Sequence, residues 1–476
     1  MDRRQFIGSS AATTVLGGAA EATLASGAAQ AAAPPRGGAK IAFDPTHARN
    51  PELGRKLPLN RDRAHAVLEE LDLDGLIALR PHNVYYLTNT TTTLTAFGEE
   101  YPAFATFARD PGQPSFLVCT NGNTWETSNG EREVPPVITF SGPANWQEYV
   151  NASPETLRVE PVSAGKKAKG NAVRAGATLT AREAGWKRAQ ETYLPNSAGS
   201  PEWALVHALR QSGLVKGRIA VDDMRIAWLL QRIGFDGVTI VPGDNVFRRI
   251  RHVKSPQEIE LLRVAQRITQ DSALAAMHAL EVGMTFQEFR QRLFAEAASR
   301  GGDPGFVLLG VTQGLLPDGV VTKGRSYMLD CSTHFKKYQG DFARTISIGE
   351  PSAEAMKRFK AQQAGREAAF AIIKAGVPFR TVEQTAREAM VKSGMPPELP
   401  TIVLHSIGLQ HGDDPSRLDV PFSVRGDLVL EENMAVTLDL PYIEIGWGGG
   451  HNEDMLRITR NGYELMNDPG DALVIV

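Results

Sequence analysis

Two strand-like segments with paired carboxylates constrain the fold most strongly. In the first, YMLDCSTHFKKYQGDFART (residues 327–345), consecutive apolar runs carry Asp330 and Asp341. A turn near Phe335 and Lys336 would make the two acids directly opposed neighbours in an antiparallel pair, with Cβ atoms about 4.5–5.5 Å apart. Like charges at that separation repel, and a divalent cation between them would convert the repulsion into chelation. The segment therefore predicts a hairpin that holds a metal ion.

A second segment repeats this arrangement. VTLDLPYIEIGWGGGHNED places Asp439 before, and Glu453 after, a glycine-rich stretch, and a hairpin centred near Gly446 would set the two acids opposite each other. LHSIGLQHGDDP adds His405 at the end of an apolar run, with His411 six residues later. Taken singly, each acid more simply caps a turn or faces solvent, and a lone histidine is more often a core residue. Two mirrored acid pairs with a histidine favour a metal centre.

The segments around these acids read as two similar halves. LEVGMTFQEFRQRL (280–293) and IKAGVPFRTVEQTA (373–386) occupy equivalent places, each after a long helical pattern and before strand-like runs. Capping boxes are expected at Ser255 and Glu258 and at Thr285 and Glu288, and Thr381 and Gln384 are expected to cap a further helix. The duplication predicts two halves related by a pseudo-twofold axis, with a cleft where their sheets meet. Chance similarity is the alternative.

The preceding residues predict a separate domain. Helical and strand-like patterns alternate from about residue 59 to 245, including a helix from Asn60 to Leu71 and strand-like runs in GLIALRPHNVYYLTN (75–89) and PSFLVCT (114–120). We expect an α/β (α+β) fold class, with an α/β domain at 59–247 and the duplicated domain at 248–476.

The N-terminus has the features of an export signal. Arg3 and Arg4 precede an apolar run of small residues, and Ala29-Gln30-Ala31 is a plausible cleavage site. Residues 1–31 therefore predict a twin-arginine signal peptide, export to the periplasm and no membrane span after its removal, with residues 32–58 as a linker or arm. A disordered alanine-rich tail is the alternative.

Charge and cysteine content exclude several classes of protein. The net charge of −3 gives no reason to expect nucleic acid or an anionic membrane surface as a partner. The two cysteines, Cys119 and Cys331, are too few for a disulfide-stapled or cysteine-ligated zinc fold and are expected to be buried free thiols.

Over residues 250–468 the chain resembles the pita-bread metallopeptidases, which include aminopeptidase P, prolidase and methionine aminopeptidase, with creatinase as a metal-free relative. The residues before them resemble the creatinase-type N-terminal domain of that family. The family's ligand order is Asp, Asp, His, Glu, Glu. This order is matched here by Asp330, by Asp341 in GDFART, by His405 in HSIGL, by Asp439 in ENMAVTLDLP and by Glu453 in NED.

The resemblance implies a centre of two divalent metal ions, of manganese, cobalt, iron or zinc. Asp341 and Glu453 would bridge the ions, Asp330 would bind one, and His405 and Asp439 would bind the other. A hydroxide bridging the two ions would attack the substrate carbonyl carbon. Kinship also implies a homodimer.

The chain departs from the family pattern at several positions. The side chain of Asp439 is one methylene shorter than the glutamate that the family has at this position. In family members, that glutamate also assists proton transfer. His451 stands where the family has arginine, and His411 falls one residue short of the family's downstream histidine. Pro317-Asp318 stand in the region that carries a histidine in peptidase members. Predicted catalytic residues are His411 and Asp439, and predicted substrate-binding residues are His411 and His451.

These residues predict an exported hydrolase that cleaves an N-terminal amide bond of short peptides, with peptides that carry proline in the second position among the candidates. One alternative is an enzyme of the same fold acting on a non-peptide small molecule, either a creatinase-like C–N hydrolase or a lyase. A second alternative is a binding or scaffold protein with a decayed site.

Overall fold

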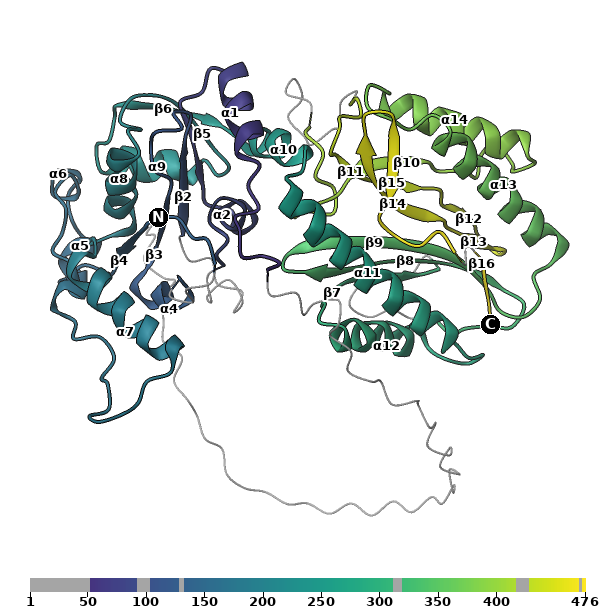
Figure 1. The fold of residues 1–476 in the computed structure, drawn as a ribbon, viewed down its shortest axis with the longest axis horizontal. Helices are drawn as coiled ribbons and strands as arrows, with labels where there is room; N and C mark the ends of the chain where they lie inside the picture. The colour runs from purple at the N-terminus through teal and green to yellow at the C-terminus, as the bar shows by residue number, and fades with distance from the viewer. Residues whose placement is uncertain (1–51, 92–102, 128–131, 311–318, 417–427, 471–472) are drawn as a thin grey trace, which may run out of the picture. The chain divides into compact units, whose positions relative to one another are not determined.

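Figure 1 shows a computed structural model of the chain, which describes residues 52–91, 103–127, 132–310, 319–416, 428–470 and 473–476. The predicted signal peptide at 1–31, most of the arm at 32–58, and Pro317-Asp318 lie outside these ranges. None of the helices within them is both long enough and apolar enough to span a membrane. The described residues belong to one compact unit, and the domain boundary expected between 247 and 248 stays a prediction.

The first sheet is mixed and runs in the order β4–β3–β2–β1–β5–β6. Strand β1 pairs antiparallel with β2 and parallel with β5, so the sheet changes direction beside its central strand. The strands are β1 (Gly75–Ala78), β2 (Phe104–Ala108), β3 (Phe116–Thr120), β4 (Val137–Phe140), β5 (Gly217–Val221) and β6 (Val238–Pro242). The helices are α1 (Arg61–Glu70), α2 (Pro81–Thr88), α4 (Thr124–Thr127), α5 (Trp146–Val150), α6 (Pro154–Leu157), α7 (Ala181–Tyr193), α8 (Pro201–Gln211), α9 (Arg225–Arg232) and α10 (Asp244–His252). The alternation of helices and strands confirms the predicted α/β arrangement.

Helix α2 corrects the strand-like interpretation of residues 81–88. Its valine and two tyrosines are typical of strands, but Pro81 occupies the first turn, where its fixed φ and missing N–H suit a helix start. Asn89 ends the helix in the left-handed conformation with φ 53°. The terminal residues therefore decide the structure of this segment against the propensity of its middle.

The second sheet repeats one three-strand pattern in reverse order. Successive neighbours are β7–β8–β9–β14–β11–β10, so the two three-strand sets meet where β9 pairs with β14. The strands are β7 (Asp303–Leu309), β8 (Ser326–Phe335), β9 (Tyr338–Ser347), β10 (Val403–Ser406), β11 (Ala435–Asp439), β12 (Tyr442–Glu444), β13 (Gly448–Gly450), β14 (Glu453–Thr459), β15 (Gly462–Leu465) and β16 (Leu473–Ile475). The mirrored order confirms the predicted duplication.

Each half contributes two helices. Helices α11 (Pro256–His278) and α12 (Phe286–Ser299) precede the first set of strands, and α13 (Ala353–Phe370) and α14 (Phe379–Lys392) precede the second (Figure 1). The capping boxes at Ser255 and Thr285 are both present. The predicted cap at Thr381 is wrong, because α14 already begins two residues earlier, after Pro378.

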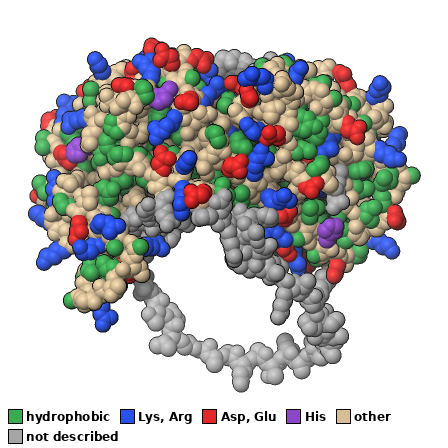
Figure 2. Space-filling view, viewed as in Figure 1, with side chains coloured by type: hydrophobic (Ala, Val, Ile, Leu, Met, Phe, Trp, Pro, Cys, Tyr) green, Lys and Arg blue, Asp and Glu red, His purple; other side chains and the backbone are tan. Residues whose placement is uncertain are grey.

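Apolar packing covers one face of the second sheet. Leu329, Cys331 and Phe342 pack with residues of α11 and α12, and Val436 and Leu438 pack with residues of α13 and α14. Because side chains alternate along a strand, the residues between these point to the opposite face. Cys119 and Cys331 are buried free thiols, as predicted. On the face of the molecule in Figure 2, basic and acidic side chains are interspersed over the described residues.

The contact between α11 and β9 depends on a glycine. A Cβ at Gly340 would lie 2.4 Å from Thr269 Oγ1 and 2.5 Å from the Ala265 carbonyl oxygen. We expect Gly340→Ala to destabilise the fold by about 1–3 kcal/mol, because the helix must move away from the strand. Gly462→Ala, where a Cβ would meet open space, is the matched control and should stay within about 0.5 kcal/mol. Urea unfolding of both variants tests this, and equal midpoints would contradict the close packing.

Candidate metal centre

One row of paired residues crosses the second sheet and carries three acids. Asp330 of β8 pairs with Ala343 of β9, Ala343 pairs with Glu453 of β14, and Glu453 pairs with Asp439 of β11. Residues paired across strands point to the same face of a sheet, so all three acids share the face opposite the helices. Between Asp330 and Glu453 the row holds only the methyl group of Ala343, which leaves room above it.

The other two predicted ligands lie on the same face. Asp341 precedes Ala343 by two residues on β9, and His405 of β10 pairs with Thr437, which precedes Asp439 by two residues on β11. Since faces alternate along a strand with a period of two, both side chains point to the same side as the row of acids. The strand register thus gathers all five predicted ligands.

The register differs in one respect from the sequence-based expectation. Asp330 and Asp341 do not face each other directly, because Ser332 lies opposite Asp341. The turn is formed by Lys336 and Lys337, with φ of 47° and 72°, one residue later than predicted. Moving the turn by one residue shifts the pairing by two, which keeps both acids on the same face. The predicted pairing of Asp439 with Glu453 is confirmed.

Among the described residues, five buried carboxylate oxygens at this face lack a hydrogen-bond partner. Within the described part of the chain, no hydrogen-bond partner exists for Asp330 Oδ1, Asp341 Oδ1 and Oδ2, Asp439 Oδ1 or Glu453 Oε1. Buried charged groups in proteins are normally paired or bound to metal ions. Three overlapping groups each bring their ligand atoms within 4.8 Å of one another: Asp341, His405 and His411; Asp330, His451 and Glu453; and His405, Asp439 and Glu453. The donor set therefore fits divalent cations.

The carboxyl groups perturb one another's protonation. Burial, and then repulsion from Asp341 and Asp439, raise the pKa of Asp330 well above its ordinary value. Burial and the same two neighbours raise the pKa of Glu453 in the same direction. Burial also opposes ionisation of Asp439, but the positive charge of His405 outweighs it and lowers the pKa of Asp439. Without cations, this pocket thus holds protons on some of its acids.

His405 is oriented as a metal-binding histidine. Its Nδ1 lies 3.1 Å from the Ser406 carbonyl oxygen, which can only accept a hydrogen bond. Nε2 therefore faces the acids, 2.9 Å from the Thr437 hydroxyl and 3.4 Å from Asp439 Oδ2. Burial lowers the pKa of His405, but Asp439 counteracts this and raises it to about 10. Fixing one ring nitrogen by a backbone carbonyl is the usual way in which proteins aim the other at a metal.

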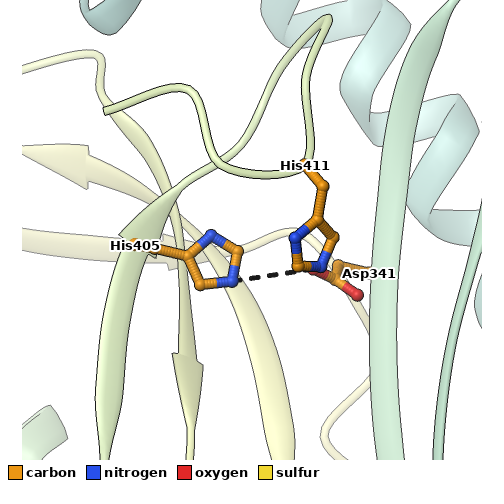
Figure 3. A group of neighbouring side chains, drawn as sticks. All are labelled: Asp341, His405 and His411. Atoms are coloured by element: carbon orange, nitrogen blue, oxygen red, sulfur yellow. Dashed lines mark ion pairs between the residues drawn. The ribbon is translucent and has the colours of Figure 1, made fainter. Parts of the chain in front are cut away.

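His411 reaches the same place from the loop after β10. Its Nε2 lies 2.9 Å from Asp341 Oδ2, although not in hydrogen-bond geometry, and its ring centre lies 4.8 Å from that of His405. Figure 3 shows the two rings meeting beside Asp341. The His411 side chain is 45% exposed, whereas that of Asp341 is 1% exposed. His411 therefore lies between the acids and solvent.

A buried cluster of oppositely charged side chains fixes the loop that carries His411. Asp413 Oδ1 accepts hydrogen bonds from Arg251 at 2.6 and 3.0 Å, and its Oδ2 lies 3.4 Å from Lys254 Nζ. These two cations outweigh burial and lower the pKa of Asp413. The loop is therefore held against the segment from α10 to α11.

The sequence interpretation missed two supporting residues. Gln266 of α11 receives a hydrogen bond from Asp341 N and donates one to Asp341 O, both at 2.7 Å. Thr437 contacts His405 Nε2. Its place two residues before Asp439 could have indicated a position on the same face. Nothing in the helical pattern around Gln266 distinguishes it from an ordinary buried polar residue.

The raised pKa values of Asp330 and Glu453 predict how pH acts on the metal-free protein. An acid with a higher pKa in the folded state keeps its proton there after the unfolded chain has lost it, so stability falls as pH rises through that range. For protein stripped of metal with a chelator, we expect the thermal midpoint to fall as pH rises above about 4–5, where the carboxyl groups of the unfolded chain lose their protons. Asp330→Asn removes one such group and should lessen the fall.

Calorimetry of metal-free and metal-loaded protein checks this expectation. Added divalent ions should stabilise the protein more at higher pH, because they replace the protons on the acids. Asp303→Asn, at an exposed acid on β7, is the matched control and should behave as the unaltered chain does. Identical pH profiles for Asp330→Asn and Asp303→Asn would contradict the pKa shifts.

Comparison with known proteins gives this geometry a family context. Residues 260–460 match the family described as Metallopeptidase family M24. The "Uncharacterized peptidase YqhT" of Bacillus subtilis is 25% identical over 245 residues, covering 50% of this chain and 68% of the relative. The "Probable dipeptidase PepE" of Mycobacterium bovis is 27% identical over 292 residues, covering 58% of this chain and 75% of the relative.

A solved structure agrees with the fold. The dipeptidase from Pyrococcus horikoshii OT3 superposes with a TM-score of 0.62 at 18% identity, covering 87% of this chain and 99% of the other. M24 enzymes depend on two metal ions, and the acids and His405 lie within the matched residues. The shared fold shows the pita-bread architecture, and the family match over residues 260–460 together with the peptidase relatives supports a metallopeptidase enzyme.

Proposed function

We propose that the protein is an exported hydrolase that uses two divalent metal ions to cleave an N-terminal amide bond of short peptides, including peptides with proline in the second position. The observation that carries this proposal is a set of four acids beside His405, two buried and two partly buried, each with at least one buried oxygen that has no hydrogen-bond partner among the described residues. The M24 match and the relative described as a probable dipeptidase support peptides as substrates.

The overlap of the candidate groups suggests how two ions would be held. Glu453 belongs both to the group with Asp330 and to the group with His405 and Asp439, which suits a residue that bridges two ions. Asp341, whose two oxygens lack hydrogen bonds, suits the second bridge. When bound, the ions would polarise the substrate carbonyl and lower the pKa of a water molecule. Manganese, cobalt, iron and zinc all suit carboxylates with imidazole.

His411 is the proposed proton donor and substrate contact. It is the most exposed of the three residues in Figure 3 and touches Asp341, so a substrate entering from solvent meets it first. Asp439 lies beside His405, and its lowered pKa keeps it ionised, which suits a metal ligand. Its role in accepting protons is proposed from its match to the family's glutamate.

A cavity lies farther along β8 than Asp330, and none of the five predicted metal ligands is among its lining residues. It has a volume of about 360 Å³ and is lined partly by Met328 of β8 and Ile443 of β12. Met328 precedes Asp330 by two residues and shares its face, about 7 Å along the strand. A cavity of this kind suits one apolar side chain of a short peptide.

Hydrolysis of a panel of di- and tripeptides, with and without proline in the second position, tests the proposal. Asp341→Ala should lower kcat/KM by roughly 10³-fold or more, because a bridging carboxylate is lost. His411→Ala should lower kcat by about 10²–10⁴-fold if it transfers protons, and raise KM if it only binds substrate. His278→Ala, at an exposed helix end, is the control. Full activity in Asp341→Ala would refute the assigned role.

The same panel separates the remaining alternative. A pocket that contains a buried His451 and the shortened Asp439 is compatible with a non-peptide amide as substrate. Turnover of small amides without any peptide hydrolysis would favour a creatinase-like reaction or a lyase. The decayed scaffold is not supported, because the chain is a metallopeptidase with acids at all four carboxylate positions.

Export is proposed from Arg3 and Arg4, the apolar run behind them and the small residues at 29–31. Replacing both arginines by lysine should leave the uncleaved protein inside the cell, whereas the unaltered chain should be found cleaved in the periplasmic fraction. Equal cleavage and export of both forms would contradict the twin-arginine route. The homodimer stays a prediction, which light scattering of the purified protein would check.

A further inference from the structure

We propose that His451 is a direct ligand of one of the two metal ions, so that each of the two positions takes one imidazole. The inference rests on the two-ion centre proposed above and assigns to His451 a role other than substrate binding. Its partners would be Asp330 and Glu453.

His451 is buried without the contacts that a buried histidine normally makes. The residue is 2% exposed, and neither ring nitrogen has a hydrogen-bond partner among the described residues. An imidazole has two nitrogens that hydrogen-bond or bind metal, and buried side-chain nitrogens are nearly always satisfied. The neighbouring atoms with the same deficiency are Asp330 Oδ1 and Glu453 Oε1, both acceptors. His451, Asp330 and Glu453 therefore all have buried polar atoms that a single cation bound among them would satisfy.

The separation of the atoms suits an ion better than a hydrogen bond. His451 Nδ1 lies 3.9 Å from Asp330 Oδ2, which is too long for a hydrogen bond. An ion bound at about 2.0–2.2 Å from each ligand holds two ligand atoms up to about 4.2 Å apart. One ligand atom each from Asp330, His451 and Glu453 lies within 4.8 Å of the other two, so small side-chain adjustments complete a site.

The backbone of His451 is fixed before any ion binds. The Thr345 hydroxyl of β9 donates to His451 O at 3.1 Å and accepts from His451 N at 3.1 Å. Thr345 follows Ala343 by two residues and points to the same face as the acids. Gly450, the residue before His451, is paired with Tyr442 in the β12–β13 hairpin. A ligand held in this way is positioned by the sheet itself.

The resulting centre is symmetrical in its ligands. One position would take His405 and Asp439, the other would take His451 and Asp330, and Glu453 is shared by both groups. An imidazole at each position favours zinc, cobalt or iron over magnesium and calcium, which prefer oxygen ligands alone. The two positions should therefore bind their ions with similar affinity.

X-ray absorption spectroscopy of zinc-loaded protein counts the imidazoles directly. The unaltered chain with two zinc ions should show about one imidazole per zinc. His451→Gln and His405→Gln should each show about half an imidazole per zinc, and His278→Gln, at an exposed position, should match the unaltered chain. His451→Gln should also weaken the binding of one zinc ion by at least about 10–100-fold, the loss caused even by residues that only support a ligand.

The outcomes separate this inference from the proposed function. Two zinc ions with about half an imidazole each in the unaltered chain would overturn the role of His451 while leaving the two-ion centre intact. If His451→Gln fails to fold, the count in His411→Gln keeps the test: about one imidazole per zinc should persist there if His451 is the second ligand, and should fall to about half if His411 is. A chain that binds no zinc at all would overturn the proposed function itself.

Discussion

Repulsion among buried carboxylates is the constraint on which the C-terminal half of this protein depends. Four acids lie on one face of a sheet, and two of them, Asp330 and Glu453, have pKa values raised by burial and by their neighbours. A chain that needed only stability would gain from replacing them, because unpaired buried charges destabilise a fold. Keeping them together makes physical sense if cations supply the missing positive charge, and peptide hydrolysis is chemistry that such cations support.

The duplicated architecture explains how the acids meet. Each half supplies a set of three strands, and the sets join where Glu453 pairs with Ala343, so the row of acids crosses the junction. Helices cover the other face, and their packing is close enough that β9 carries Gly340 where α11 passes. From that helix, Gln266 holds the backbone of Asp341. The apolar core thus fixes the register, and the register fixes the site.

Much of this arrangement follows from local sequence signals, and the exceptions have physical reasons. The pairing of Asp439 with Glu453 was predictable because the glycines around Gly446 mark the turn between them. The turn of the first hairpin was predicted one residue too early. It is formed by two lysines with positive φ, and lysine is not a residue type that indicates such a turn. Helix α2 was missed because its ends, not its middle, determine it. The support from Gln266 is a tertiary contact and leaves no periodic pattern in the sequence.

The central claim, that cations hold these acids together, is tested most directly by counting metal ions in crystals by anomalous diffraction. Protein crystallised after incubation with manganese, cobalt or zinc should show two anomalous peaks per chain, both among the side chains of the candidate ligand groups. Acid side chains that keep their places with no anomalous peak between them, or that turn away into solvent, would contradict the account.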